Sequence, residues 1–316
     1  MISERPRNNW RGYLFIAPAT IYLAVFSLIP VAFAAYLSLH RWHLLKSDHP
    51  FVGCGNYTAL AANPLFRGAV WNTLVYAMAS VPLGVVSALV VAMLVSRPLK
   101  AIGVFRVLYY IPAVCSQVAL SMVWIWILLP EKGLISHGIR FLNLLTETVG
   151  SIGGVDLSIF HIDLGTDLLA MRGWAMAALV LMSMWIGLGP RMVIFIAGLQ
   201  GIPETLYEAA DLDGCNRWQR FWYVTLPQLA PTMLFVTVTT TIAAFQLFTP
   251  VYMMTQGGPQ RTTDVVSFHI FQEAWRKYEA GMASAQSYVL FAMILVVAAF
   301  QIALMRKGLD REEAAQ

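Results

Sequence analysis

Residues 208–227 read EAADLDGCNRWQRFWYVTLP and form a polar island between two of the most apolar regions of the chain. Five charged residues fall within the first 13 positions of the island: Glu208, Asp211, Asp213, Arg217 and Arg220. Only 12% of the whole chain is charged, so this density sets the segment apart from its surroundings. The apolar regions on either side define the fold class, and the island itself indicates the function.

The composition departs from that of a soluble protein. The chain has 316 residues, is 58% hydrophobic and has a mean hydropathy of +0.64, whereas soluble domains are about 45–50% apolar and about a quarter charged. The net charge of +4 is small for this length and gives no nucleic-acid-binding footprint. The six histidines are scattered, and the cysteines at 54, 115 and 215 are far apart and match no metal-binding pattern. The composition indicates a membrane protein without a metal site.

Long runs without charge divide the chain. One run of 29 residues separates Arg11 from Arg41, and it is too long for the apolar core of a cleavable signal peptide, so we expect it to stay as an anchor. A helix needs about 20 residues to cross a membrane, and only a helix satisfies its own backbone polar groups in lipid. The sequence therefore predicts an all-α integral membrane protein with six transmembrane helices, at about 13–39, 70–96, 106–129, 174–199, 229–254 and 283–305.

Six crossings place both termini on one side of the membrane. The short connection SRPLKAIGVFR, residues 96–106, has three basic residues and no acidic one, so the positive-inside rule places it and both termini in the cytoplasm. Residues 130–172 are then an external loop and residues 200–227 a cytoplasmic loop. The chain accordingly divides into three parts: residues 1–69 with the N-terminal tail, first helix and external loop; the transmembrane domain 70–305; and the cytoplasmic tail 306–316.

The polar island predicts a helix–turn–helix at the membrane surface. Pro203 suits the first turn of a helix that Gly214 ends, and Asn216 can cap a second short helix. One face of the second helix is largely aromatic because four residues recur at three- and four-residue spacing: Trp218, Phe221, Trp222 and Thr225. In the first helix, Ala209 and Ala210 leave a slim surface that another protein could approach closely. An amphipathic connector that merely closes a loop is the alternative interpretation.

The same segment resembles the EAA---G---------I-LP signature of binding-protein-dependent ABC importer permeases. The matching residues are Glu208-Ala209-Ala210, Gly214 and Leu226-Pro227, and Val224 stands where the signature has isoleucine. The resemblance implies a type-1 ABC importer permease fold, in which the loop is a coupling helix that docks on a cytoplasmic ATPase. The residues that it implies for this coupling are Glu208, Ala209, Ala210, Asp213, Gly214, Leu226 and Pro227.

Further stretches resemble the carbohydrate-uptake branch of that family, in particular its maltose- and glycerol-3-phosphate-type first permease subunit. They include FVGCGNYTAL, RVLYYIPAVCS, GLQGIPETLYEAA and MTQGGPQRTTDVVSFHIFQEAW. Gly257-Gly258-Pro259, in an external loop, is typical of that subunit, and the resemblance implies that it docks the binding protein. A simple helix-ending turn would explain this tripeptide equally well. The large external domain of the enteric maltose permease has no counterpart here.

A substrate pathway is expected where helices are interrupted near the middle of the membrane. The fourth predicted helix carries Gly187 and Pro190 immediately before Arg191, and an arginine inside a membrane span is by default a functional-site hypothesis. The alternative is that its side chain reaches toward the lipid headgroups or binds helix-end carbonyls. Similarity to the maltose-type permease maps the pathway onto Ser183, Ile186, Gly187, Pro190, Thr240, Ala243, Ala244 and Leu247, with Gln246 one residue off that face.

The leading interpretation is the non-catalytic permease subunit of an ATP-driven importer for a sugar, oligosaccharide or polyol. The chain has no GxxxxGK[ST] phosphate loop, so it binds no cofactor itself, and ATP and Mg²⁺ belong to a partner ATPase. The resemblance implies a bacterial or archaeal inner membrane and four kinds of partner: a second permease subunit in a heterodimer, two cytoplasmic ABC ATPase subunits, an external substrate-binding protein and membrane lipid.

Three alternatives stay open. An anionic substrate, such as glycerol-3-phosphate or a uronate oligosaccharide, would keep the same role and use the charge of Arg191. An ion-driven secondary transporter would need carboxylates or histidines inside the spans, and the sequence has none there. A membrane enzyme would need a metal-binding or nucleophilic motif, which is also missing. Neither of the last two explains residues 208–227.

Overall fold

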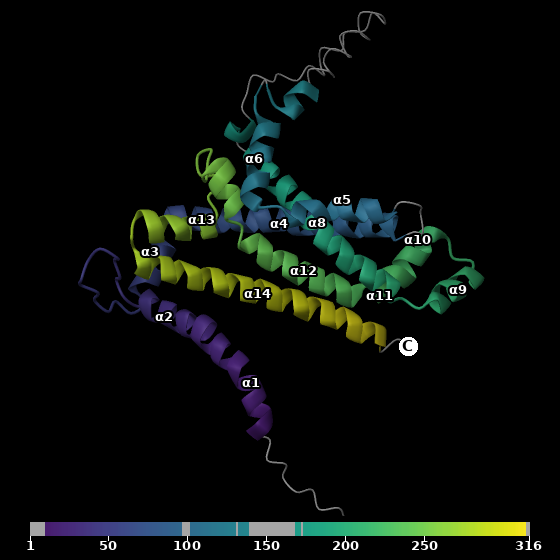
Figure 1. Cartoon of the computed structure of the whole chain (residues 1–316), viewed down its shortest axis with the longest axis horizontal. Coiled ribbons are helices and arrows are strands. Elements are labelled where there is room, and N and C mark those ends of the chain that lie inside the picture. The colour runs from purple at the N-terminus through teal and green to yellow at the C-terminus, as the bar shows by residue number, and fades with distance from the viewer. Residues whose placement is uncertain (1–9, 97–101, 131, 139–167, 172, 314–316) are drawn as a thin grey trace, which may run out of the picture. The chain divides into compact units, whose positions relative to one another are not determined.

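Helices form every regular element in the part of the chain that the computed structural model describes (Figure 1). The described residues are 10–96, 102–130, 132–138, 168–171 and 173–313. The all-α fold class is therefore confirmed. Most of the predicted external loop at 130–172 lies outside the described residues. The chain divides into two compact units, residues 1–63 with 270–289 and residues 64–269 with 290–316.

Four described helices are long and apolar enough to cross a membrane: Tyr13–Ser38, Pro64–Val95, Trp174–Gln200 and Ala280–Leu304. Two pairs of shorter helices pass the same test together but are sharply bent. These pairs are Ile102–Val114 with Gln117–Leu128, bent by 101°, and Arg217–Gln228 with Ala230–Phe245, bent by 69°. The described part of the chain thus has four spans, or six if each bent pair crosses once.

Two of the predicted helices are broken in the structure. Instead of one helix at 106–129, α5 (Ile102–Val114) and α6 (Gln117–Leu128) meet at Ser116, whose ψ of 130° is not helical. Pro112 removes one backbone hydrogen bond from the last turn of α5, which weakens the helix just before the break. Uncharged runs measure the distance between charges, so they do not reveal such a bend.

The predicted helix at 229–254 is also interrupted. The helix α12 (Ala230–Phe245) ends early, and the π-helix η5 (Val251–Thr255) follows after a short non-helical stretch. Pro250 has no amide hydrogen to donate to the carbonyl of Gln246 four residues earlier, so a continuous helix would lose that bond. The break leaves the segment from Gln246 to Pro250 free to line a cavity.

In the larger unit, α4 (Pro64–Val95) and α8 (Trp174–Gln200) pack along each other. α5 packs on α8, and α12 packs on both α4 and α8. The buried alanines and glycines on α4 and α8 are Ala69, Ala77, Gly84, Ala88, Ala92, Ala175, Ala178 and Gly189. Lipid gives little hydrophobic drive for helices to associate, so small side chains that permit close contact are what hold such spans together.

Glycines on α8 set two of these contacts. A Cβ atom at Gly189 would lie 2.5 Å from the carbonyl oxygen of Tyr109 and 2.7 Å from the Cα atom of Tyr110, both on α5. A Cβ atom at Gly198 would lie 2.7 Å from Oγ1 of Thr232 on α12. None of these three distances is compatible with a real side chain, so the neighbouring helices approach α8 as closely as they do because these positions are glycine.

In the smaller unit, the first span consists of α1 (Trp10–Leu23), the π-helix η1 (Ala24–Leu28) and α2 (Ile29–Ser38). Nδ2 of Asn56, on α3 (Gly55–Ala62), donates to the carbonyl oxygens of Ser38 at 2.7 Å and His40 at 3.0 Å. The hydroxyl of Tyr288 donates to the carbonyl of Val31 at 2.6 Å. These bonds tie the end of the first span to α3 and to the start of α14 (Ala280–Glu313).

The remaining elements are short. They are the 3₁₀ helix η3 (Leu168–Ala170), α9 (Glu204–Leu212), α10 (Arg217–Arg220), the π-helix η4 (Phe221–Thr225), α11 (Leu226–Gln228), α13 (Val266–Phe271) and the π-helix η6 (Gln272–Arg276).

Alanine at Gly189 tests the contact between α5 and α8. The added methyl group must push the two helices apart, and such overpacking costs typically about 1–3 kcal/mol. We expect Gly189→Ala to lower the thermal unfolding midpoint of the detergent-purified protein by several degrees. Gly103→Ala on α5 is the matched control, because a Cβ atom there meets nothing within 4 Å. Equal midpoints for the two variants would contradict the close contact.

Candidate functional site

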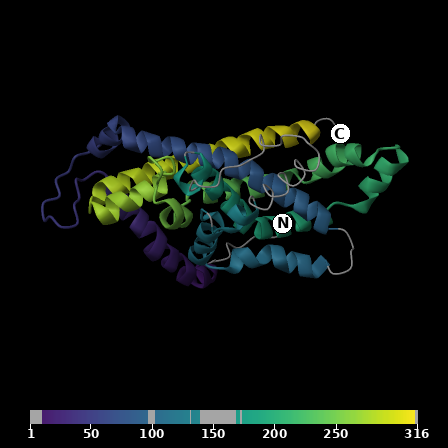
Figure 2. The ribbon, with the colours of Figure 1, turned by 90° about the horizontal axis from the view of Figure 1, so that it is seen from above.

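The polar island lies within the predicted helix–turn–helix, which spans residues 203–228 (Figures 1 and 2). Helix α9 begins after Pro203, and Gly214 follows it with a φ of +75°, a left-handed conformation that glycine adopts without strain. Asn216 caps α10 in a reciprocal pair with Gln219, with both bonds at 2.9 Å. The predicted turn at Gly214 and cap at Asn216 are confirmed.

Side chains hold the two halves of the helix–turn–helix together. Nη1 of Arg220 donates to both carboxylate oxygens of Asp211, at 2.8 and 3.0 Å. The same guanidinium lies 5.6 Å from the ring centre of Tyr207, whose hydroxyl is 3.2 Å from Oγ1 of Thr225. The ion pair is exposed and contributes little alone, but with the ring contact it fixes the angle between α9 and the helix that follows.

The surface of this segment differs from the prediction at two positions. Glu208, Ala209 and Asp213 are exposed, whereas Ala210 is only 6% exposed and cannot present a small outer surface. Successive helical residues point about 100° apart, so two adjacent alanines cannot share one face. Thr225, which the sequence spacing placed on the aromatic face, is likewise buried within the chain. Trp218 and Trp222 from that face are exposed, and Phe221, Leu226 and Pro227 are half-buried.

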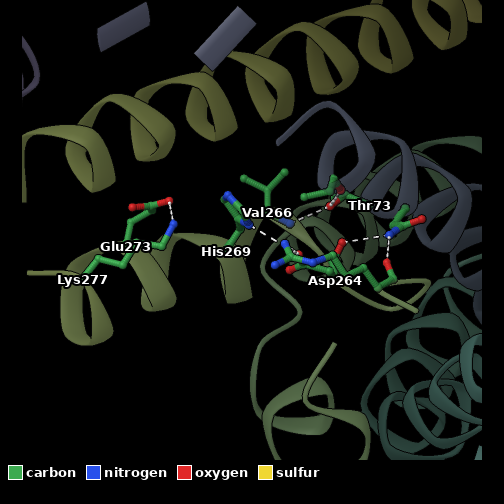
Figure 3. Close-up of polar contacts among 9 residues, drawn as sticks. Thr73, Asp264, Val266, His269, Glu273 and Lys277 are labelled. Carbon is green, nitrogen blue, oxygen red and sulfur yellow. Dashed lines mark hydrogen bonds and ion pairs between the residues drawn. The ribbon is translucent and has the colours of Figure 1, made fainter. Parts of the chain in front are cut away.

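The loop with Gly257-Gly258-Pro259 is held against the beginning of α4 (Figure 3). Thr73 accepts a hydrogen bond from the backbone N–H of Val266 at 3.0 Å. Nδ2 of Asn72 donates to the carbonyls of Arg261 at 2.7 Å and Asp264 at 3.0 Å. Because the side chains of two adjacent α4 residues bind its backbone, the loop has a fixed shape rather than being a simple connection.

Threonines organise the inside of the same loop. Oγ1 of Thr263 donates to the carbonyl of Gly258 at 2.6 Å and lies 2.8 Å from Oγ1 of Thr255. The buried carboxylate of Asp264 lies 3.4 Å from Nδ1 of His269 and 3.5 Å from Nη1 of Arg261. The tripeptide therefore lies in a loop that its own side chains order, and Gly257 adopts a left-handed conformation with a φ of +86°.

A cavity of about 210 Å³ lies between α4, α6, α8 and the end of α12. The structure brings together around it all but one of the residues predicted for a substrate pathway: Ser183, Ile186, Gly187, Arg191, Thr240, Ala243, Ala244, Gln246 and Leu247. Pro190 is not among the described residues that line it. Gln246 reaches the cavity because α12 ends at Phe245, so helical spacing no longer decides where this side chain points.

The sequence analysis missed part of the lining. Tyr76 and Ser80 of α4 and Gln117 of α6 contribute polar groups, and Phe248, Thr249 and Pro250 follow from the break after α12. A signal for the α4 residues was available, because Thr73, Tyr76 and Ser80 recur at three- and four-residue spacing within an apolar span. The lining mixes hydroxyls and amides with apolar surface and includes one charged group, Arg191.

Arg191 extends along α8 toward Ser183. Its Nη2 atom donates to the carbonyl oxygen of Ser183 at 3.3 Å, and no hydrogen-bond partner is present among the described residues for Nη1, which is buried. Within the described residues, no cluster of three or more histidine, cysteine or acidic side chains could hold a metal ion. The hydroxyl, amide and guanidinium groups of the lining suit the cavity to binding a polar molecule.

Comparisons with known proteins match the chain to membrane components of transport systems. A family described as "Binding-protein-dependent transport system inner membrane component" matches residues 58–311. The chain is 32% identical over 302 residues to the lactose transport system permease protein LacF of Rhizobium radiobacter, with 94% of each chain covered. It is 30% identical to the sulfoquinovosyl glycerol transport system permease protein SmoG of Agrobacterium fabrum, covering 93% of this chain and 89% of that one.

The fold is also found in solved structures, among them the crystal structure of a bacterial ABC transporter involved in the import of the acidic polysaccharide alginate. The TM-score is 0.75 at 20% identity, with 95% of this chain and 96% of that chain covered. The predicted importer permease fold is thereby confirmed.

Valine at Thr73 tests the support of the loop. The substitution keeps the shape of the side chain but leaves the buried N–H of Val266 without an acceptor, which costs about 1–3 kcal/mol. We expect faster hydrogen–deuterium exchange in peptides covering residues 256–268 of the purified protein. Thr239→Val on α12 is the control, because that hydroxyl donates only to its own helix. Unchanged exchange in Thr73→Val would show that α4 does not hold the loop.

Proposed function

Because the chain belongs to the family of binding-protein-dependent transport system inner membrane components, we propose that it forms half of the translocation pathway of an ATP-driven importer for a sugar, oligosaccharide or polyol. It is a multi-pass permease of the inner membrane and a non-catalytic subunit of an ABC transporter. The carbohydrate class is supported by relatives named for lactose and for sulfoquinovosyl glycerol.

The observation that carries the proposal is the cavity, because it has the mixed surface that a hydroxylated ligand needs. Ser183, Thr240 and Gln246 offer hydrogen bonds to hydroxyl groups, while Leu247 and Phe248 offer apolar contact to the carbon skeleton. At about 210 Å³ the cavity is smaller than typical ligand pockets of about 300–1,000 Å³. A second permease subunit, in a heterodimer with this chain, would supply the other half of the pathway.

The helix–turn–helix would dock on a cytoplasmic ATPase. Glu208, Ala209 and Asp213 are exposed on it, and Gly214 sets the turn between its halves. The contacts of Arg220 with Asp211 and with the ring of Tyr207 together fix the angle between its halves, which suits a part that transmits force. Two ATPase subunits would bind ATP and Mg²⁺, and their closure would move this segment and switch the pathway from inward-facing to outward-facing.

The loop with Gly257-Gly258-Pro259 would face outward and contact the binding protein that delivers the substrate. Its fixed backbone, held by Asn72 and Thr73, suits recognition of a protein surface. In this orientation both termini lie in the cytoplasm, and residues 203–228 lie there too. The division into residues 1–69, the transmembrane domain 70–305 and the tail 306–316 follows from the same topology.

Affinity purification with the neighbouring subunits tests the coupling role. In mild detergent we expect an ATPase and a second permease to co-purify with the chain. Glu208→Lys and Gly214→Asp should each reduce ATPase recovery at least severalfold, because one reverses an exposed charge and the other places a side chain at a left-handed position. Recovery of the second permease should stay unchanged and report an intact membrane domain.

Matched controls separate the contact from general effects of charge. Glu204→Lys makes the same charge reversal one turn earlier on α9, and Gly201→Asp adds the same side chain at a φ of −78°, where it is not strained. Both should retain the ATPase. If all four variants recover the ATPase equally, this segment is not where the ATPase docks.

Labelling of the native cysteines tests the orientation. Cys54 is exposed near the end of the first span, and Cys215 is half-buried in the turn between α9 and α10. A membrane-impermeant maleimide should label Cys54 in intact spheroplasts and Cys215 only after permeabilisation. Cys54→Ser and Cys215→Ser assign the signals. Labelling of Cys215 in intact spheroplasts would reverse the proposed topology.

A further inference from the structure

The charge of Arg191 lies at the middle of its helix. A nitrogen of the guanidinium binds the carbonyl of Ser183, and a Cβ atom at Gly187 would meet the Nη2, Cζ and Nε atoms of this side chain. Gly187 is 13 residues from either end of α8, which is roughly 20 Å at 1.5 Å per residue. The side chain therefore extends away from the nearer helix end, and it does not reach for the lipid headgroups.

Two glycines make room for the guanidinium. A Cβ atom at Gly187 on α8 would overlap it, and a Cβ atom at Gly84 on α4 would overlap Nη1 from the opposite side. Each of the two helices, α4 and α8, thus has a glycine beside the guanidinium. This slot holds the guanidinium mainly by its shape, because its one hydrogen bond within the described part of the chain is the long one to the carbonyl of Ser183, at 3.3 Å.

No negative charge balances Arg191 within the described spans of its unit. The helices α4, α5, α6, α8 and α12 contain no aspartate or glutamate, and the described lining of the cavity contains none either. A guanidinium keeps its charge in proteins, and an uncompensated charge at mid-membrane is costly. Ionisable groups inside membrane spans commonly mark substrate or ion pathways.

We propose that the imported molecule carries an anionic group, a carboxylate, sulfonate or phosphate, and that Arg191 binds this group in the cavity. This inference rests on the proposed function and narrows its substrate class to acidic carbohydrates or polyol phosphates. The planar fork of arginine matches two oxygens of such a group. Among the residues that the structure describes, Nη1 has no hydrogen-bond partner and Nη2 has a weak one, so an arriving anion can draw the guanidinium from the slot at little cost.

The rest of the lining fits the uncharged part of such a molecule. Ser183, Gln117 and Gln246 can bind hydroxyls next to the anionic group. A neutral sugar could accept hydrogen bonds from Arg191 through its hydroxyls, but it would bring no negative charge to balance the guanidinium. A carboxylate on the second permease subunit is the competing partner for Arg191.

Uptake by the complete importer, reconstituted in proteoliposomes with its binding protein, tests the proposal. The probes are three matched pairs: glycerol 3-phosphate and glycerol, sulfoquinovosyl glycerol and glucosyl glycerol, and digalacturonate and its neutral digalactose analogue. We expect uptake of the anionic member of at least one pair at about tenfold or more above the neutral member. Arg191→Gln should lower that uptake about tenfold or more, and Arg191→Lys should keep part of it.

The control is Arg67→Gln, the same substitution at an exposed arginine of α4 outside the cavity, which should leave uptake unchanged. ATPase co-purification and basal ATP hydrolysis should be equal in all variants. An assembled importer that takes up only neutral molecules, equally well with Arg191→Gln, overturns the inference and leaves the proposed function standing. Loss of the second permease in Arg191→Gln would identify that subunit as the partner of the charge and overturn the inference as well. A chain that recruits no ATPase overturns both.

Discussion

Close approach of other helices to α8 is the constraint on which the larger unit depends. Lipid does not drive helices together as water does, so contact area must come from backbones that lie near each other. Gly189 lets α5 reach α8, and Gly198 does the same for α12. Gly187 serves a third purpose, since the space that it leaves is filled by the side chain of Arg191. One helix with three glycines thus positions two neighbours and one charge.

Breaks in the surrounding helices complete the site. A continuous helix uses all its backbone polar groups internally, so polar groups beside a pathway come mainly from side chains and from interruptions. The chain has one interruption at Ser116, between α5 and α6, and another at Gln246, after α12. Gln117 and Gln246 both line the cavity, each directly at an interruption. The bends that make the spans hard to predict are also the places where amide side chains meet the cavity.

The sequence predicts features that local chemistry decides. Gly214 and Asn216 are confirmed because a turn glycine and a helix cap depend on only a few neighbouring residues. Residues whose role depends on packing were missed or misplaced. Tyr76 looks like an ordinary interfacial aromatic until α4 meets α8. Ala210 looks as accessible as Ala209 in the sequence, but it is buried in the folded chain. Charge-free runs gave the spans but could not show that residues 106–129 bend by 101°.

Chain connectivity links the helix–turn–helix, residues 203–228, to the helices that line the cavity without any intermediate element. Only Gly201, Ile202 and Pro203 separate α8 from α9, and Ile202 is buried, so α9 cannot shift freely on a loose linker. On the other side, Leu229 alone separates α11 from α12, and its side chain is 0% exposed. The two helices that continue from the helix–turn–helix, α8 and α12, are also the ones that provide Arg191 and Thr240 to the cavity. An ATPase that moved residues 203–228 as one body would therefore change the distance between Arg191 and Thr240. That change would alter the affinity of the cavity for a bound molecule.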